Sequence, residues 1–261
     1  MSGGAEQSKV YDLPSPPLDQ NRNVPQLLVP WVPENWDLSA DLHTWQWGAV
    51  PQLPPLFLAD GSGVAQQQTI VRVCHDKYAL YVCFECCDSD IWGAYTRRDE
   101  SIFDEEVVEV FISHGPDPKQ NYYEFEISPN GVLLDARVHN PTELRRDLQV
   151  DCNWDCPDLR WQATRNDLMG HWWAAMAIPW SSIGGAHGSG FIYRANFFRI
   201  ERTHGSEPEF SCWSPTFTAP ADFHKPSYFG ILDTGIRGGA LKTQVQHFVG
   251  ENVAWEKVTA N

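Results

Sequence analysis

The sequence lacks the features that would place the protein in a membrane or on a nucleic acid. No apolar run approaches the ~18 residues of a membrane span, so a transmembrane helix is excluded. Only 19 Lys and Arg stand against 34 Asp and Glu, and the net charge of −15 repels phosphate backbones. The N-terminus has no apolar core segment, so we expect no signal peptide. The compartment is unknown, with the cytoplasm as the default.

Several catalytic and cofactor motifs are also missing. The sequence has no Gly-x-Ser-x-Gly elbow, no phosphate loop and no metalloprotease helix. Only Met169 and Met176 are internal methionines, which argues against a haem ligated by methionine and histidine. The seven cysteines are an odd number, and we interpret them as free, buried residues rather than a disulfide framework. Cys152 and Cys156 form the one pair with plausible loop spacing.

The most informative stretch runs from Ser101 to Pro129. Val108, Val110 and Ile112 alternate with Val107, Glu109 and Phe111, and the following run YYEFEISP alternates in the same way. This period of two is typical of half-buried strands, and the loop HGPDPKQN between them favours a turn. Glu109, Glu124 and Glu126 thus lie on strands beside aromatic residues. A sheet face with carboxylates and rings suits sugar binding, although a solvated sheet face has the same pattern.

The rest of the chain has the same character. Ranges 69–75 and 78–86 predict a hairpin, residues 33–47 a loop with a turn of helix, and further short strands follow to residue 232. Ten or more strands with few or no helices predict an all-β fold, an antiparallel two-sheet β-sandwich. We divide the chain into a flexible lead-in (1–24), the sandwich (25–235) and a C-terminal tail (236–261). Apolar residues at helical spacing allow a short helix in the tail, and disorder is the alternative.

Six segments, in the same order, resemble the family 9 carbohydrate-binding modules and their stand-alone relatives. They are YALYVCFECCDSDI, SIFDEEVVEVFIS, AIPWSSIG, RANFFRIE, CWSPT and FHKPSYFG, and the resemblance covers roughly residues 25–233. It implies a jelly-roll-like sandwich that binds sugars, often with structural calcium, and that is frequently attached to xylanases and other glycoside hydrolases. Twelve tryptophans exceed the needs of a generic core, which favours an aromatic binding surface, although tryptophans also fill the cores of β-sandwiches.

The resemblance also suggests site residues. In family members two tryptophans sandwich a sugar ring, and the matching positions here are Phe103 and Phe223. The acid that accepts a sugar hydroxyl matches Glu109. The family's arginine on the next strand matches Glu126, and because this change replaces a donor by an acceptor, the family's preference for reducing ends is not carried over.

Other residues complete the candidate sugar site from their own chemistry. Glu124 and Asn196 can satisfy hydroxyl groups, and His224 stands next to Phe223. Arg199 is one position out of phase with Asn196, so we expect one of the two to face the site and the other the core. For each residue a structural role stays open; Glu109, for example, can pair with Arg137 or Arg199 instead of a sugar.

The acidic loops offer a candidate calcium site. Oxygen ligands for this ion are available from four aspartates: Asp88, Asp90, Asp99 and Asp104. Their spacing matches no EF-hand loop, and a solvated acidic loop is the alternative. No cofactor other than calcium is suggested.

The sequence therefore predicts a non-catalytic carbohydrate-binding sandwich that supports carbohydrate catabolism. Its expected partner is an oligo- or polysaccharide such as xylan, and a separate glycoside hydrolase chain is a second candidate. An enzyme is the less favoured interpretation, but paired carboxylates on adjacent strands could cleave O-glycosyl bonds. A protein-interaction sandwich without a sugar ligand is the other alternative.

Overall fold

The structure is a computed structural model that describes residues 23–34, 36–38, 45–117, 120–185, 190–235, 242–249 and 252–259. The strands are β1 (Gln26–Leu28), β2 (Phe57–Leu58), β3 (Thr69–His75), β4 (Ala79–Cys87), β5 (Val107–His114), β6 (Asn121–Ile127), β7 (Leu133–His139), β8 (Gln149–Asp151), β9 (Arg160–Asn166), β10 (His171–Pro179), β11 (Ile192–Glu201), β12 (Glu209–Cys212), β13 (Gly230–Asp233), β14 (Lys242–Val249) and β15 (Asn252–Thr259). The helical segments are α1 (Trp45–Gly48) and the 3₁₀ turns η1 (Ile102–Asp104), η2 (Arg145–Asp147), η3 (Trp180–Ile183) and η4 (Pro226–Tyr228). None of the described helices has the length and apolarity needed to cross a membrane.

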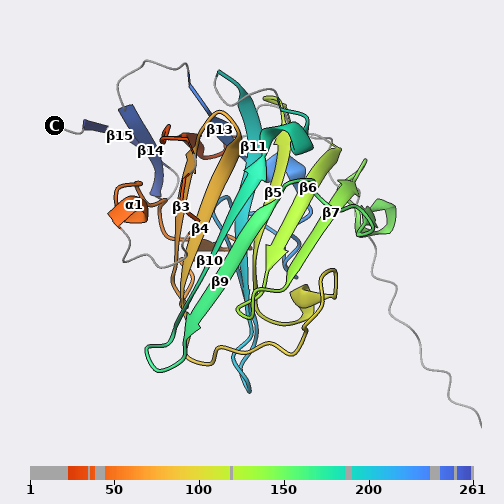
Figure 1. Cartoon of the computed structure of the whole chain (residues 1–261). Coiled ribbons are helices and arrows are strands. Elements are labelled where there is room, and N and C mark those ends of the chain that lie inside the picture. The colour runs from red at the N-terminus through yellow and green to blue at the C-terminus, as the bar shows by residue number, and fades with distance from the viewer. Residues whose placement is uncertain are drawn as a thin grey trace, which may run out of the picture.

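The strands form two sheets, which confirms the predicted β-sandwich (Figure 1). The larger sheet has eleven strands, in the order β15-β14-β1-β13-β11-β5-β6-β7-β8, with β12 paired to β11 and β2 paired to β12. The smaller sheet has the order β3-β4-β10-β9. The hairpin of β3 and β4 turns at Asp76, whose Oδ1 accepts the backbone N–H groups of Tyr78 at 2.7 Å and Ala79 at 2.9 Å. This aspartate therefore closes the turn that its sequence pattern predicts.

The main core lies between the two sheets. Alternation along β5 directs Val108, Val110 and Ile112 into this core, together with Phe125 and Ile127 of β6. Because successive side chains of a strand point to opposite faces, Glu109 and Phe111 must lie on the outer face of the larger sheet. That face is covered by a second apolar cluster, and the segment around Trp36 and Trp47 covers the outer face of the smaller sheet. The central strands β4, β5, β10 and β11 are thus buried on both faces, whereas β8 and β9 at the sheet edges are exposed or half-buried.

Most of the tryptophans whose side chains the structure describes are buried in the interior. Among the described residues the buried ones are Trp36, Trp47, Trp154, Trp172, Trp173, Trp180 and Trp213. The structure therefore corrects the interpretation that their excess reflects an aromatic binding surface. All seven cysteines are free, as predicted, and Cys152 and Cys156 form no disulfide.

The two ends of the chain depart from the predicted pattern. β1 pairs with β13 in parallel, with Leu27 opposite Leu232, so the sheet is not purely antiparallel. In the C-terminal region β14 and β15 form an antiparallel hairpin, and β14 pairs with β1 through Leu27 and Val245. The short helix considered for residues 236–261 is therefore replaced by strands, at the opposite end of the larger sheet from β7 (Figure 1). Of the predicted lead-in, residues 1–22 lie outside the described residues.

Candidate functional site

A cavity of about 340 Å³ opens on the outer face of the larger sheet. Six of the eight residues that the sequence proposes for sugar contact line it: Phe103, Glu109, Glu124, Glu126, Phe223 and His224. The others that line it are Asp104, Phe111, Leu134, Arg145, Leu148, Val150, Cys152, Ile200, Arg202, Phe210 and Ala221. Residues more than a hundred positions apart in sequence thus meet at one place.

The carboxylates of the cavity come from two neighbouring strands. Glu109 of β5 stands directly opposite Glu126 of β6 in the antiparallel register, and Glu124 follows two residues away on the same face. Each offers a carboxylate oxygen, and these oxygens all lie within 4.8 Å of one another. The three residues are buried, with exposed fractions of 2%, 5% and 1% for Glu109, Glu124 and Glu126. We call them the glutamate cluster.

Burial changes the acidity of the glutamate cluster. Desolvation raises the pKa of Glu124 to about 7. Desolvation and the charge of neighbouring glutamates raise the pKa of Glu109 and Glu126 well above that of a solvated carboxyl group. Burial therefore favours the protonated form of these carboxyl groups.

The basic side chains at the cavity are engaged elsewhere. Arg145 Nη2 lies 2.9 Å from Asp222 Oδ1, and Arg202 lies over the Phe210 ring. Within the described part of the chain, neither arginine forms an ion pair with the glutamate cluster. Arg145 and Arg202 are residues that the sequence did not indicate, because both lie in or beside irregular segments whose folding brings them to the cavity.

Two phenylalanines that lie far apart in the sequence supply rings to the cavity. Phe103 lies in η1 and is 41% exposed. Phe223 is 6% exposed, and one face of its ring stacks on Phe198 with the centroids 4.2 Å apart. Phe103 thus offers a ring to solvent, whereas Phe223 belongs to both the cavity wall and the outer apolar cluster.

His224 is held by protein groups. Its Nδ1 lies 2.8 Å from the hydroxyl group of Tyr122, and its ring lies against Phe111 with the centroids 5.1 Å apart. Burial lowers the pKa of His224 to about 3, so the ring is neutral at pH 7. The histidine therefore brings no positive charge to the glutamate cluster.

Asn196 does not line the cavity. It shares the outer face of β11 with Phe198, but its amide is used within the protein. Its Nδ2 donates to Ser214 O at 2.8 Å and its Oδ1 accepts from Ser214 N at 2.9 Å. This pair of hydrogen bonds fixes the chain after β12 to β11, so the structure assigns Asn196 a structural position instead of the proposed one.

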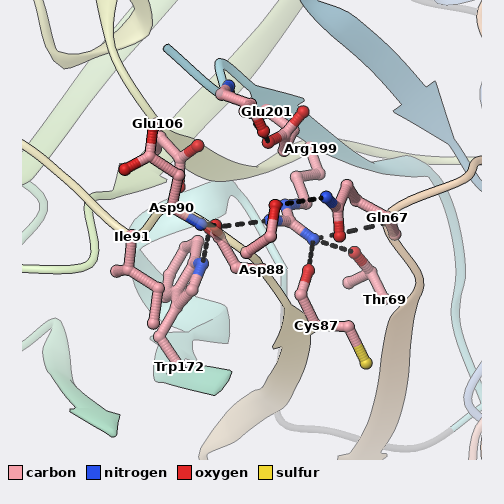
Figure 2. Close-up of polar contacts among 12 residues, drawn as sticks. Gln67, Thr69, Cys87, Asp88, Asp90, Ile91, Glu106, Trp172, Arg199 and Glu201 are labelled. Atoms are coloured by element: carbon pink, nitrogen blue, oxygen red, sulfur yellow. Dashed lines mark hydrogen bonds and ion pairs between the residues drawn. The ribbon is translucent and has the colours of Figure 1, made fainter. Parts of the chain in front are cut away.

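Arg199 faces the interior between the sheets, away from the cavity. Its Nη2 lies 3.0 Å from Asp88 Oδ2 and its Nη1 donates to Cys87 O at 2.7 Å, as Figure 2 shows. Trp172 also donates to Asp88, and both ionic side chains are fully buried. The expectation that one of Asn196 and Arg199 would face the core is met by Arg199, but neither one reaches the site.

The four aspartates considered for calcium do not gather into one site. Asp88 lies with Glu106 and Glu201 beside Arg199 (Figure 2), and Asp99 lies in a separate group with Asp135 and Asp155. Asp90 accepts from the backbone N–H and the ring of His204, and Asp104 is an exposed residue at the cavity. An arginine already pairs with an acid in each of these two groups. Arg199 pairs with Asp88, and Arg98 Nη2 lies 2.6 Å from Asp135 Oδ1. These four residues therefore do not fit a common calcium ion.

A second, open hollow of about 710 Å³ adjoins the cavity. Phe210 and Ala221 line both, and the second hollow adds polar side chains that include Asp60, Gln66 and Glu207. The enclosed cavity thus continues into a wider polar surface.

Comparison with known proteins identifies relatives of the same architecture. The sequence profile described as carbohydrate-binding family 9 matches residues 65–234. An extracellular protein of Arthroderma benhamiae is 28% identical over 169 residues, which are 62% of this chain and 76% of that protein.

Solved structures agree on the fold. A Bacteroides uniformis protein proposed to bind carbohydrate superposes with a TM-score of 0.64 at 17% identity, covering 79% of this chain and 97% of that one. A family 9 module of Caldicellulosiruptor kristjanssonii in complex with glucose gives a TM-score of 0.58 at 15% identity, covering 82% and 98%. A family 9 module from the same organism in complex with cellotriose gives a TM-score of 0.58 at 15% identity, covering 83% of this chain and 97% of that one.

Proposed function

Because the chain belongs to carbohydrate-binding family 9, we propose that it binds a glycan in the cavity of the larger sheet. The observation that carries the proposal is the convergence of Phe103, Phe223 and the glutamate cluster on one cavity. Sugar recognition needs ring faces for the apolar face of a pyranose and planar polar groups for its hydroxyls. Both kinds of group are present within this one cavity.

Each residue type has a distinct role in the proposed complex. The exposed Phe103 ring stacks on the sugar, and Phe223 forms another part of the cavity wall. Oxygens of the glutamate carboxyl groups accept hydrogen bonds from sugar hydroxyls, and a carboxyl group that keeps its proton also donates one. Since phenylalanine offers less area than tryptophan, we expect weaker stacking than two tryptophans would give.

The related modules guide the choice of sugar. Caldicellulosiruptor kristjanssonii family 9 modules have been solved with glucose and with cellotriose, so gluco-configured sugars are the first ligands that we propose. The hollow beyond Phe210 and Ala221 offers polar side chains to a second or third sugar unit. We therefore infer that an oligosaccharide binds more tightly than a monosaccharide.

The arrangement of acids favours binding over hydrolysis. Glycosidases place their two carboxyl groups on either side of the scissile bond, about 5–9.5 Å apart. Here the oxygens of Glu109, Glu124 and Glu126 lie within 4.8 Å and belong to one wall. We infer a non-catalytic role in carbohydrate catabolism, in which any cleavage is performed by another chain.

Calorimetric titration of the full chain with glucose, cellotriose and xylotriose tests the proposal. Phe103→Ala should reduce the affinity several-fold because it removes the exposed stacking ring while the fold is kept. Tyr78→Ala is the matched control, since Tyr78 is 51% exposed but lies outside this cavity. Absence of binding to every sugar at millimolar concentration, or equal losses in both variants, would contradict the proposed site.

A further inference from the structure

A thiol, an imidazole and a carboxyl group lie together on the outer face of the smaller sheet. Cys87 of β4 stands directly opposite His171 of β10 in the antiparallel register. Glu85 precedes Cys87 by two residues, so alternation places both side chains on the same face of β4. Opposite residues of paired strands have their Cβ atoms about 4.5–5.5 Å apart, which brings the polar groups within reach of one another. We call Glu85, Cys87 and His171 the thiol triad.

The two ring nitrogens of His171 have different partners. Nε2 lies 3.7 Å from Cys87 Sγ, which is within hydrogen-bond distance for sulfur. Nδ1 lies 3.6 Å from Glu85 Oε1. The carboxylate therefore favours the tautomer that carries its proton on Nδ1 and leaves the lone pair of Nε2 facing the thiol.

The thiol is accessible, and its position is fixed. Cys87 and His171 are both half-buried. The backbone N–H of Cys87 donates to Gln68 O at 2.8 Å, and its carbonyl accepts from Arg199 Nη1 at 2.7 Å. Figure 2 shows the sulfur pointing away from Arg199. A small reagent can therefore reach a sulfur atom that is held beside an imidazole.

The charges around the thiol explain why its reaction needs a base. Burial and the negative charge of Glu85 raise the pKa of Cys87, and Asp88 acts in the same direction while Arg199 opposes it. The sulfur therefore stays protonated at neutral pH, whereas the thiolate is the form that attacks disulfides. A base in contact with the S–H group removes this obstacle, because it accepts the proton as the new bond forms.

We propose that Cys87 is a site of covalent modification by small disulfides, with His171 as its base and Glu85 as the residue that positions the imidazole. The S–H proton of Cys87 passes to His171 Nε2 while the sulfur attacks one sulfur of the disulfide. The S–S bond of the reagent breaks, and the departing thiolate takes the proton from the imidazole. The products are a mixed disulfide at Cys87 and one free small thiol, so atoms and electrons balance.

The same side chains fit a metal ion less well. Zinc in proteins takes three or four protein ligands. In the thiol triad Glu85 faces Nδ1 and Cys87 faces Nε2, so the side of the ring that faces the sulfur offers an ion only two ligands of this group. Proton transfer along a row of thiol, imidazole and carboxylate is the chemistry that this arrangement supports.

The test is the reaction of the full chain at pH 7 with 2,2′-dithiodipyridine, a neutral disulfide that releases an absorbing thione. Cys152, the other half-buried cysteine, is replaced by serine in every protein tested, so that it does not compete. We expect one rapidly formed adduct, located at Cys87 by peptide mass spectrometry. The rate should be at least about tenfold lower in His171→Gln, which lacks the base. Glu85→Gln should lower the rate less, because the imidazole stays but loses its orienting partner.

His139→Gln is the matched control. It removes a half-buried imidazole whose Nδ1 lies 2.8 Å from Asn121 Oδ1 rather than beside a cysteine, so the rate should not change. The pH profile separates a base from a merely structural residue. A thiol ionises by itself at high pH, so the loss in His171→Gln should shrink as the pH rises toward about 10. If His171→Gln does not fold, as judged by circular dichroism, Glu85→Gln supplies the same comparison.

Four results would each overturn the proposal. They are no adduct at Cys87, an unchanged rate in the folded His171→Gln or its substitute, an equal loss in His139→Gln, and a loss of the same size at every pH. The thiol triad lies on the smaller sheet and the glycan cavity on the larger one. The modification of Cys87 therefore does not rest on the proposed carbohydrate function, and the two can fail separately.

Discussion

Arg199 of β11 and Asp88, the residue after β4, form an ion pair 3.0 Å long that joins the two sheets. Both side chains are fully buried. The guanidinium also binds the carbonyl of Cys87, and Trp172 of β10 donates to the same aspartate. The pair therefore connects strands of both layers at a place where water does not reach.

Removing one partner of this pair should destabilise the fold strongly. In Asp88→Ala the arginine stays buried without its counter-charge, and breaking a buried pair costs about 3–5 kcal/mol. The free energy of unfolding from urea denaturation measures the effect. Asp90→Ala, which breaks the exposed contact with His204 two residues away, is the control and should change stability only slightly. Similar losses in both variants would show that the buried pair has no special importance.

Glu106 should make stability depend on pH. Desolvation, followed by its hydrogen bond with Asp88, raises the pKa of Glu106 from 4.5 to about 9. Between these values the folded carboxyl group is protonated and the unfolded one is ionised, so unfolding releases a proton. Stability should therefore be highest at low pH and fall as pH rises toward about 9, by up to about 1.4 kcal/mol per pH unit for this group.

The comparison of wild type with Glu106→Gln isolates this contribution. Glutamine does not titrate, so the decline of unfolding free energy between pH 6 and pH 9 should be shallower in the variant. Thermal denaturation in a series of buffers measures it. Parallel pH profiles for the two proteins would contradict a raised pKa at this position.

Gly230 should tolerate no side chain. It begins β13, and a Cβ atom there would overlap the Trp213 ring and lie 2.9 Å from Pro25 O. Because backbone cannot yield as a flexible side chain does, we expect Gly230→Ala to lose about 1–3 kcal/mol. Gly63→Ala is the control, since no atom lies within 4 Å of the added carbon. Urea denaturation of both variants should show the difference.

Thiol reactivity should separate the cysteines by burial. Cys87 and Cys152 are half-buried, and the other five are buried. Burial raises the pKa of all five, which keeps them as unreactive thiols. A thiol reagent at pH 8 should therefore label at most Cys87 and Cys152 rapidly in the native protein, and all seven residues in denaturant. Rapid labelling in the double variant Cys87→Ser, Cys152→Ser would contradict the structure.

The strands that the sequence predicts best are those with strict alternation. The hairpin of β3 and β4 and the pair β5 and β6 follow from it, including the outward direction of Glu109. β8 was not predicted because it has three residues, all exposed, and its strand character comes from pairing with β7. The sequence of β14 fits two patterns. Thr243, Val245 and Val249 have the spacing of a strand, and Val245, Phe248 and Val249 have the spacing of a helix. The pairing with β15 and β1 therefore decides that this segment is a strand.

Two sources in the sequence predict the candidate site: the alternation of side chains along each strand, and the segments that resemble the family. Glu109, Glu124 and Glu126 share a face by alternation alone, and Phe103 and Phe223 come from the matched segments. Asn196 and Arg199 could not be placed, because phase does not tell whether a polar group is satisfied by a neighbouring segment. Their partners, Ser214 and Asp88, are brought to them only by the packing of the whole chain.

The parallel pairing of β1 with β13 has a consequence for how the protein is made. Gln26 lies opposite Ile231, so the first strand emerges from the ribosome roughly 200 residues before its partner exists. Its other neighbour, β14, is completed later still. During synthesis the central strands β5, β6 and β7 can pair locally, whereas the edge that would receive β1 stays open. The order of translation thus makes the outer part of the larger sheet the last to close.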